Sequence, residues 1–360
     1  MYAFECLDCS LRDIMKVVDP KKYNMPFGGI TVVLGGDFRQ ILPVINSGSR
    51  DDVVPATITR SRQWLTAKIM ILYRNTRLNQ SVIPEEVLSL KLFAEWVLRI
   101  RNGVIEAPKG SSFDYGEDEI VIPPDFCDSE IKNSIKNMIE WTYPNPLSHY
   151  RTSNWSSQLF IVQSIPGEDF TYYSVDRAEE FGGTPSELSF AFPPEYLNSV
   201  NLPGLPPHEL KLKVGVCVML MRNLNQILGL CNDTRMMITR CLSHGVECEV
   251  ICGAFIGMKH FIPRKELCPT DTKLPFKLIR KQMPLQLCYS MTINKSHGQS
   301  LERVGLYLPN SVFTHGQFYV AVSRVTSPSG LKVFIDSRSG ESTNVTRNVV
   351  YKEVFYNLPQ

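Results

Sequence analysis

The sequence predicts a mixed α/β fold, because its apolar residues recur with both the helical and the strand period. Residues 28–37 form an apolar run between two glycine pairs, as in a buried strand. A helical spacing instead joins the first apolar residues, Phe4, Leu7, Leu11 and Ile14. With 360 residues, 43% of them hydrophobic, the chain can bury a substantial core, and its length suggests two domains.

Four elements are predicted in the first hundred residues. The opening helix should end at Asp19-Pro20, since proline stops a helix that precedes it. Residues 28–37 should form a buried strand of a parallel sheet, and residues 69–73 a second strand. Residues 84–101 should form an amphipathic helix whose apolar face contains Val87, Leu88, Leu92, Trp96 and Ile100.

The rest of the chain contains a poorly periodic stretch and then a series of short strands. Residues 105–208 are rich in Pro, Ser, Tyr and acidic residues, so loops and short elements are expected there. Strands are then predicted at 210–215, 216–220, 235–241, 246–252 and 259–262, spaced as in a small antiparallel barrel or meander. Two last strands, 285–291 and 331–335, should flank a helix at 315–325.

Composition limits the possible functions. The formal net charge is only +2, but it is unevenly distributed: residues 111–190 hold 4 basic and 14 acidic residues, and residues 207–303 hold 14 basic and 7 acidic ones. A basic region of this kind can meet an anion. The sequence shows no secretory signal and no apolar run of membrane-spanning length, which predicts a soluble intracellular protein. The pair Cys6 and Cys9 has no second pair at matching spacing, so no zinc site is expected.

Residues 35–40, Gly-Gly-Asp-Phe-Arg-Gln, close the first predicted strand. Ligands of open α/β sheets bind beyond the carboxyl ends of strands, where the glycines would let the backbone turn sharply and present Asp37, Arg39 and Gln40. The Gln40 amide both donates and accepts, which suits the orienting of a water or a phosphate oxygen. A turn capped by Asp37 explains these residues equally well.

Residues 292–300, Thr-Ile-Asn-Lys-Ser-His-Gly-Gln-Ser, are dense in side-chain donors. A loop of this composition fits contacts to phosphates of a nucleotide or of a nucleic-acid backbone. Alternatively, Asn294 and Ser296 cap a helix and Lys295 is a solvated surface charge. The density of donors favours the phosphate contacts.

The predicted helix 315–325 could be capped by Thr314, with Phe318 and Val322 packed inward. Arg324 would then project from its carboxyl end. An arginine in this position either complements the helix dipole or reaches a γ-phosphate as an arginine finger. A single sequence does not separate these two roles.

Taken together and in this order, these segments resemble the Pif-type DNA helicases of superfamily one, especially plant forms and those carried by Helitron transposons. The matching segments are residues 35–44, 75–78, 93–96, 205–210, 229–232, 292–300 and 317–325. Matches extend over most of residues 1–340 and become sparse between residues 105 and 190.

The resemblance implies a P-loop NTPase fold of the RecA-like helicase type. Residues 1–80 would be the C-terminal part of a first RecA-like domain, and residues 81–147 a connecting helix with an acidic, loop-rich segment. Residues 148–208 and 270–340 would form the second RecA-like domain, with a degenerate N-terminal piece. Residues 209–269 would be an inserted small β-barrel, and residues 341–360 a tail.

The activity that the resemblance implies is ATP-dependent unwinding of DNA in the 5′-to-3′ direction. ATP and Mg²⁺ would be the cofactors, and single-stranded and forked DNA the partners. The family's roles are DNA repair, recombination and telomere maintenance, with the nucleus as the expected compartment and the mitochondrion as the alternative.

The resemblance also assigns roles residue by residue. Gln40 would sense the γ-phosphate, and Arg77 and Arg324 would stabilise charge on the transferring phosphoryl group. Further ATP contacts are expected at Asp37, Gly298 and Gln299, and DNA contacts at Thr292, Asn294, Lys295 and Ser296.

Three departures from the family pattern matter. No Gly-Lys dipeptide occurs, so the phosphate-binding loop G-x-x-x-x-G-K-[ST] is missing, and no apolar strand ends in Asp-Glu to hold Mg²⁺. We therefore expect the Mg²⁺ ligands upstream of residue 1, in a longer protein of which this is a truncated copy. The alternative is a remnant that binds single-stranded DNA without hydrolysing ATP. Asp233 stands where the family usually has glycine, a mild change because Asp tolerates a left-handed turn.

Overall fold

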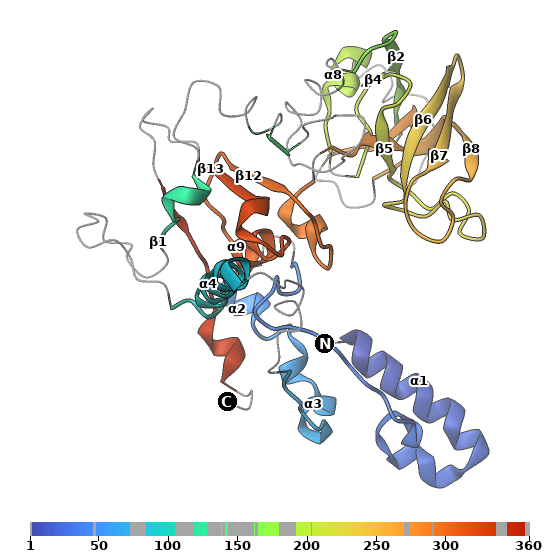
Figure 1. Cartoon of the computed structure of the whole chain (residues 1–360). Coiled ribbons are helices and arrows are strands. Elements are labelled where there is room, and N and C mark those ends of the chain that lie inside the picture. Colours follow the sequence, from blue (N-terminus) through green and yellow to red (C-terminus); the bar gives the residue numbers. More distant parts are fainter. Residues whose placement is uncertain are drawn as a thin grey trace. The chain divides into compact units, whose positions relative to one another are not determined.

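The structure is a computed structural model that describes residues 2–45, 48–72, 84–104, 119–127, 138, 141–142, 162, 165–179, 192–202, 204–269, 274–289, 291–335 and 344–356. The chain divides into two compact units (Figure 1). Unit 1 comprises Met1–Ile131 and Ile293–Gln360, and unit 2 comprises Lys132–Thr292. The limits of the five domains inferred from the sequence stay predictions.

Unit 1 combines helices with short strands. Its helices are α1 (Tyr2–Val18), α2 (Arg50–Val53), α3 (Arg62–Thr66), α4 (Pro84–Asn102) and α9 (Gln317–Val322). Its 3-10 turns are η1 (Pro20–Asn24), η2 (Pro26–Gly29), η3 (Ile58–Arg60), η5 (Pro124–Phe126), η7 (Ile293–Ser296), η8 (Pro328–Gly330) and η9 (Lys352–Phe355). Strands β12 (Val304–Leu308) and β13 (Leu331–Ile335) pair in parallel, and β1 (Glu119–Val121) pairs antiparallel with β14 (Val345–Arg347).

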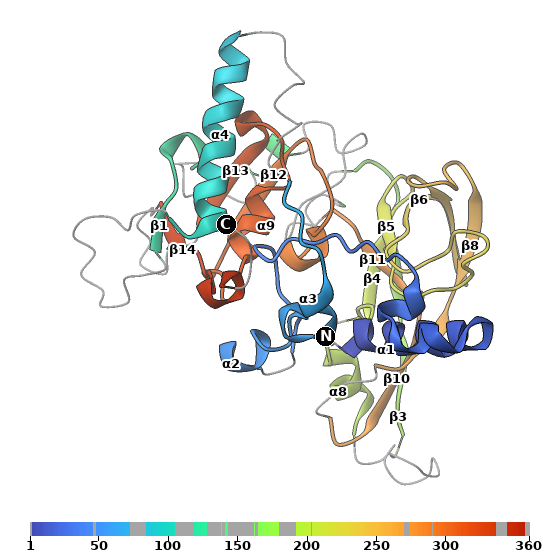
Figure 2. The same cartoon turned by 90° about the horizontal axis from the view of Figure 1, so that it is seen from below.

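The core of unit 1 lies where α4 and α9 pack near the parallel pair β12–β13 (Figure 2). The predicted helix 84–101 is confirmed as α4, but its buried face differs from the predicted one. Leu88 and Leu92 are 60% and 58% exposed, whereas Phe93 and Ile100 are buried. The inward stripe is Phe93, Trp96, Val97 and Ile100, which keeps the helical spacing but is rotated around the axis.

The first predicted helix is confirmed as α1. It ends at Val18, immediately before Asp19-Pro20, as the sequence predicted. The Asp19 side chain accepts a hydrogen bond from the Lys21 backbone N–H, which caps η1. Within α1, the Asp8 carboxylate binds Arg12 and accepts the Phe27 backbone N–H, so it fixes the return of the chain toward the helix.

The two strands predicted in the first hundred residues are wrong for the residues that the structure describes. Residues 30–36 and 67–72 have no regular secondary structure, and Tyr73 lies outside the described residues. Among the described residues, no strand pairs with either segment. Several of their apolar side chains are exposed to solvent, with Val33 82% and Leu72 97% exposed. An apolar run becomes a strand only where a neighbour accepts its backbone hydrogen bonds.

Unit 2 is built mainly of antiparallel strands. They are β2 (Phe170–Tyr173), β3 (Val175–Glu179), β4 (Glu209–Leu212), β5 (Cys217–Leu220), β6 (Arg235–Leu242), β7 (Gly245–Val250), β8 (Lys259–Pro263), β9 (Lys265–Leu267), β10 (Lys277–Gln282) and β11 (Leu285–Leu287). The largest sheet has the order β11-β5-β6-β7-β8, beside the smaller sheets β3-β10-β9 and β2-β4. Helix α8 (Pro194–Ser199) also belongs to this unit.

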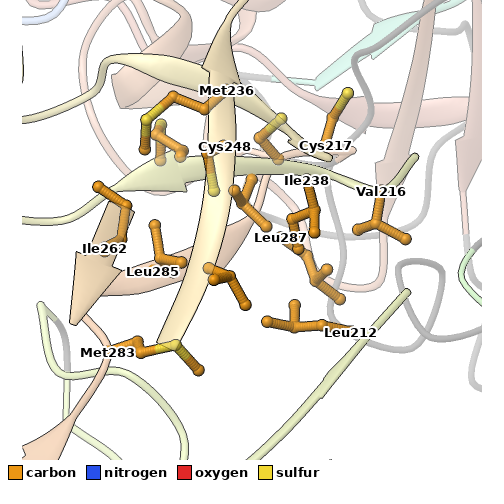
Figure 3. Packing of buried hydrophobic residues seen from close by; sticks show 14 of the residues in the cluster. Leu212, Val216, Cys217, Met236, Ile238, Cys248, Ile262, Met283, Leu285 and Leu287 are labelled. Carbon is orange, nitrogen blue, oxygen red and sulfur yellow. The ribbon is translucent and has the colours of Figure 1, made fainter. Parts of the chain in front are cut away.

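The predicted series of short strands is confirmed as β4 to β8, in which β5 to β8 form an antiparallel meander. Its inward side chains come from successive strands and pack into one core (Figure 3). Met236, Ile238 and Cys248 are completely buried, which fits the alternation of inward and outward residues along β6 and β7. Asp233, in the turn before β6, has φ +65°, so the left-handed turn expected at this position is present.

Candidate functional site

Helix α9 lies between two loops that the sequence singled out, residues 37–40 and residues 293–300 of unit 1. It begins after Gly316 and ends at Val322, shorter than the predicted 315–325. Phe318 and Val322 are fully buried, as predicted. Gly316, with φ +69°, is the residue before the first turn, and no side chain caps this end, so the predicted cap by Thr314 is wrong.

The first loop, residues 37–40, is organised by the Asp37 carboxylate. One oxygen accepts the Arg39 backbone N–H at 3.1 Å and the Arg101 guanidinium at 3.2 Å, and the other lies 3.5 Å from Gln40 Nε2. The turn closes between Gln40 N–H and the Asp37 carbonyl. Asp37 thus does what the capping interpretation predicted, while it also holds Gln40. The turn is made here rather than at Gly35 and Gly36, neither of which has a positive φ.

Two guanidinium groups gather around this one carboxylate. Arg39 lies over the Phe355 ring at 5.0 Å, and Arg101 over the Tyr319 ring at 5.9 Å. Burial, and next the charge of Arg101, lower the pKa of Arg39. The Nε atoms of Arg39 and Arg101 are buried without a hydrogen-bond partner. The cluster therefore has more donors and positive charge than Asp37 alone satisfies, which suits a phosphoryl group.

Sequence reasoning did not select Arg101. It belongs to α4, 64 residues from Asp37, and sits in a helix with several other charges. No local signal marks it, because its position beside Asp37 is set by packing of α4 against α9.

The second loop, residues 292–300, presents part of its donor set to solvent. Thr292, Asn294 and Lys295 are exposed, as contacts to DNA require. Ser296 is buried instead, and its hydroxyl donates to the Ile293 carbonyl at 2.6 Å within η7. The Ser296 side chain is therefore a local capping group here, and the expected DNA contact by its hydroxyl finds no support.

The other two residues selected in this loop shape its backbone. Gly298 has φ +76°, a conformation that favours glycine. Gln299 is half-buried, and its side-chain amide donates to the Lys295 carbonyl at 3.2 Å.

Arg324 joins this loop to α9. Its Nη1 donates to the carbonyls of Ser296 and Gln299 at 3.2 and 2.9 Å, and its Nε donates to the Val320 carbonyl at 2.8 Å. Its backbone carbonyl accepts the Leu301 N–H. The buried guanidinium thus holds the 292–300 loop against the end of α9. Its expected role as an arginine finger stays a prediction.

The fit to ATP and Mg²⁺ is partial. Arg39 and Arg101 supply positive charge beside Asp37, and their unpaired Nε atoms are buried. The 360 residues contain no phosphate-binding loop, and within the described residues no three His, Cys, Asp or Glu side chains gather as metal ligands. Arg77 lies outside the described residues. No helix in the described part of the chain has the length and apolar character to cross a membrane.

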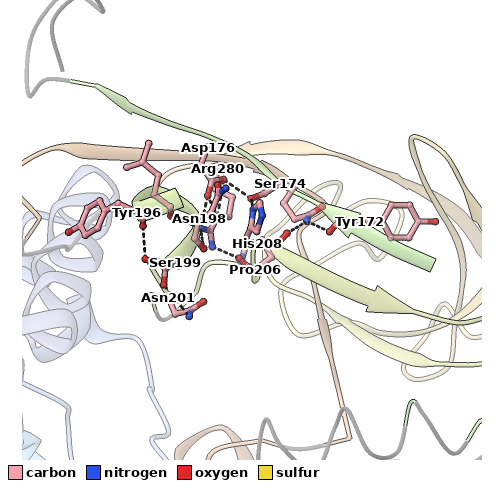
Figure 4. A network of polar contacts seen from close by, with 12 residues as sticks. Tyr172, Ser174, Asp176, Tyr196, Asn198, Ser199, Asn201, Pro206, His208 and Arg280 are labelled. Atoms are coloured by element: carbon pink, nitrogen blue, oxygen red, sulfur yellow. Dashed lines mark hydrogen bonds and ion pairs between the residues drawn. The ribbon is translucent and has the colours of Figure 1, made fainter. Parts of the chain in front are cut away.

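In unit 2, a buried polar network fixes the segment that carries the matched residues 205–210 (Figure 4). Arg280 forms an ion pair with Asp176 at 2.6 Å, and both side chains are fully buried. Arg280 also donates to the carbonyls of Leu197 and Pro206, both at 3.0 Å. The Ser174 hydroxyl contacts Asp176 and the ring of His208. Strands β3 and β10 are thereby tied to α8 and the segment after it.

Comparison with known proteins gives two family matches. Residues 1–111 match the PIF1-like helicase model, and residues 195–241 match the 2B domain of DNA helicase Pif1. The chain is 27% identical over 322 residues to the human ATP-dependent DNA helicase PIF1, covering 87% of this chain and 42% of that protein. The zebrafish (Danio rerio) protein of the same name is 26% identical, with 92% and 44% covered. The chain thus spans less than half the length of these relatives.

Solved structures agree on the fold. The crystal structure of Pif1 helicase from Candida albicans superposes with a TM-score of 0.52 at 20% identity, covering 97% of this chain and 74% of that one. A Bacteroides Pif1 bound to single-stranded DNA gives a TM-score of 0.51 at 19% identity, covering 95% and 74%. The fold is therefore that of the RecA-like Pif1 helicases, and the sequence matches show that the chain is related to the PIF1-like helicase family.

Proposed function

We propose that the chain is part of an ATP-dependent DNA helicase that unwinds DNA in the 5′-to-3′ direction. The observation that carries this proposal is the arrangement around α9. The 37–40 loop lies at its start, with two guanidinium groups that hold unpaired donors, and Arg324 binds the 292–300 loop at its end. A nucleotide-sensing loop and a DNA-contacting loop joined by one short element suit a motor that couples hydrolysis to movement.

In this assignment, each cluster acts at a different phosphate. Gln40 with Arg39 and Arg101 would orient and neutralise the terminal phosphoryl group of ATP, and Thr292, Asn294 and Lys295 would bind the DNA backbone. ATP would supply the free energy and Mg²⁺ the neutralising charge on its phosphates. Single-stranded and forked DNA are the substrates in this proposal, with DNA repair, recombination and telomere maintenance in the nucleus as its setting.

A second candidate follows from the sequence itself. The second candidate is a remnant that binds single-stranded DNA without hydrolysing ATP. The 360 residues lack the Gly-Lys of a phosphate-binding loop, so their site for ATP is incomplete. We therefore expect the chain alone to hydrolyse ATP negligibly, and to bind single strands with an affinity that falls steeply with salt. Sequencing the transcript upstream of Met1 separates the two candidates, because a helicase requires an in-frame G-x-x-x-x-G-K-[ST] segment.

The DNA contact can be tested on the chain as it is. Fluorescence anisotropy with a labelled oligothymidine should show weaker binding after Lys295→Ala and a salt slope reduced by about one. Lys21→Ala, an exposed lysine on η1 of the same unit, is the matched control and should leave both unchanged. Equal affinities for wild type and Lys295→Ala, or binding that is indifferent to salt, would refute the DNA-contacting role of the loop.

The catalytic role needs a protein that hydrolyses ATP. In the chain extended to include the upstream phosphate-binding segment, Arg324→Ala should reduce DNA-stimulated turnover by about 10³-fold or more. Arg324→Lys keeps the charge but loses the forked geometry, so it should recover little turnover. A loss of turnover in step with a loss of thermal stability in both variants would mean that Arg324 only holds the loop.

A further inference from the structure

The backbone of the 37–40 loop is held by His315, the residue two positions before α9. His315 Nε2 lies 2.8 Å from the Phe38 carbonyl oxygen, and the Tyr351 backbone N–H donates to Nδ1 at 2.7 Å. A backbone N–H can only donate, so Nδ1 must be unprotonated and the ring proton must be on Nε2, which donates to Phe38. Only the neutral Nε2–H tautomer makes both bonds.

The next residue, Gly316, lets the same loop approach α9 closely. A side-chain carbon built on Gly316 would lie 2.5 Å from the Arg39 carbonyl oxygen and 2.7 Å from the Gln40 carbonyl carbon. Both atoms belong to the backbone, so they cannot move aside without moving the loop. His315 and Gly316 therefore set the position of three consecutive loop residues, the last of which is Gln40.

The surroundings of His315 favour its neutral form. The side chain is completely buried, and burial lowers its pKa. The hydrogen bond to the Phe38 carbonyl, Asp37 on the loop and Glu353 on the C-terminal segment act in the opposite direction, while Arg50 adds to the lowering. The rings of Tyr351 and Phe355 pack against the imidazole with centroids 5.3 and 5.9 Å away. The C-terminal segment 349–355 thus packs against His315, which holds the 37–40 loop.

We propose that His315 and Gly316 are positioning residues for Gln40, with His315 acting as a neutral bridge between Phe38 and Tyr351. The bridge fixes the position of the Phe38 backbone relative to α9, so that the Gln40 amide keeps one position relative to Asp37. The catalytic consequence rests on the proposed function, whereas the bridge itself can be measured without ATP.

Two variants separate the hydrogen bonds from the ring. His315→Phe keeps a ring of similar size and loses both bonds, and His315→Gln keeps an N–H donor that can reach the Phe38 carbonyl. His244, exposed in the hairpin between β6 and β7, provides the control His244→Phe. If His315→Phe does not fold, the comparison of His315→Gln with wild type carries the test.

The first measurement is hydrogen exchange, which needs no activity. Losing the bond to Nδ1 should make exchange at Tyr351 about tenfold faster in His315→Phe and His315→Gln. Exchange across residues 38–42 should rise in His315→Phe and stay nearer to wild type in His315→Gln. The control should match wild type throughout. Unchanged exchange at Tyr351 in both His315 variants would overturn the proposed bridge.

The second measurement is DNA-stimulated ATP turnover in the chain extended upstream. A displaced Gln40 should lower kcat by about 10- to 100-fold in His315→Phe, with KM for ATP nearly unchanged and partial recovery in His315→Gln. Equal kcat in wild type and His315→Phe would overturn the positioning role even if the bridge exists. A wild-type protein without turnover would instead refute the proposed function, and the exchange measurement would still decide whether the bridge exists.

Discussion

Replacing Arg280 by methionine tests whether the buried polar network holds unit 2 together. The substitution leaves the Asp176 carboxylate fully buried without its cation, and it removes the donors to the carbonyls of Leu197 and Pro206. Breaking a buried ion pair from one side costs about 3–5 kcal/mol. Typical domains are stable by about 5–15 kcal/mol, so the variant should lose a large fraction of the free energy of unfolding of unit 2.

Urea unfolding should be followed by hydrogen exchange over β3 and β10, so that unit 2 is observed separately from unit 1. Arg177→Met is the matched control, because Arg177 lies on the adjacent strand and pairs with Glu266 while half-exposed. Surface pairs of this kind contribute about 0–1 kcal/mol. The double variant Asp176→Leu with Arg280→Met should recover much of the loss, because no buried charge remains unpaired. A cost for Arg280→Met no greater than that for Arg177→Met would refute this reasoning.

Three more expectations follow from the geometry. Gly229→Ala should lower the melting temperature more than Gly253→Ala does, because both have positive φ but only a Gly229 side chain would collide with the Phe255 ring; calorimetry of both variants decides. The melting temperature of unit 1 should be highest above about pH 6.5 and fall at lower pH, because the pKa of His315 is lowered in the folded state and the unfolded chain therefore binds a proton more readily. Thermal unfolding should show a larger decrease for wild type than for His315→Gln. Burial raises the pKa of Cys248 to about 12, so maleimide at about pH 8 should modify exposed Cys6 and Cys9 and leave Cys248 intact, as judged by peptide mass spectrometry.

The sequence predicted best those elements whose hydrogen-bond partners lie near them in the chain. The meander from β5 to β8 pairs neighbours along the chain, so alternation and turn residues were enough to place it. Strand β13 was predicted with the bounds that the structure has, Leu331–Ile335. Its parallel partner β12, Val304–Leu308, was missed, and the two strands pair only through the connection that contains α9.

Prediction failed where tertiary contacts decide. The run at 28–37 has the composition of a buried strand, yet no described strand lies beside it and the run stays unpaired. In the candidate site, Asp37 and Arg324 were selected from local pattern, whereas Arg101 and His315 were not. Both reach the 37–40 loop from distant points in the chain, and an arginine or histidine at such a position carries no local signature.

The C-terminal segment, residues 348–355, makes contacts that its sequence did not reveal. Val354 is buried with Leu42 and Val53, and Glu353 binds the Arg50 guanidinium through both carboxylate oxygens. Asn348 donates to the Ile100 carbonyl at the end of α4. Residues 348–355 therefore connect the end of α4 to the region after the Gln40 loop. A segment with these contacts is a structural part of unit 1.

Helix α9 is the element through which the two loops can influence each other. Its six residues span about 9 Å, and the side chains of Phe318, Val320 and Val322 are fully buried. His315 and Gly316 hold the Gln40 loop at its start, and Arg324 holds the 292–300 loop just beyond its end. Under the proposed function, a shift of the 292–300 loop on binding DNA would act on Arg324 and, through it, on α9. The displacement would then reach Gln40 through the His315 bridge, because hydrogen bonds or close backbone contacts join each end of the helix to a loop.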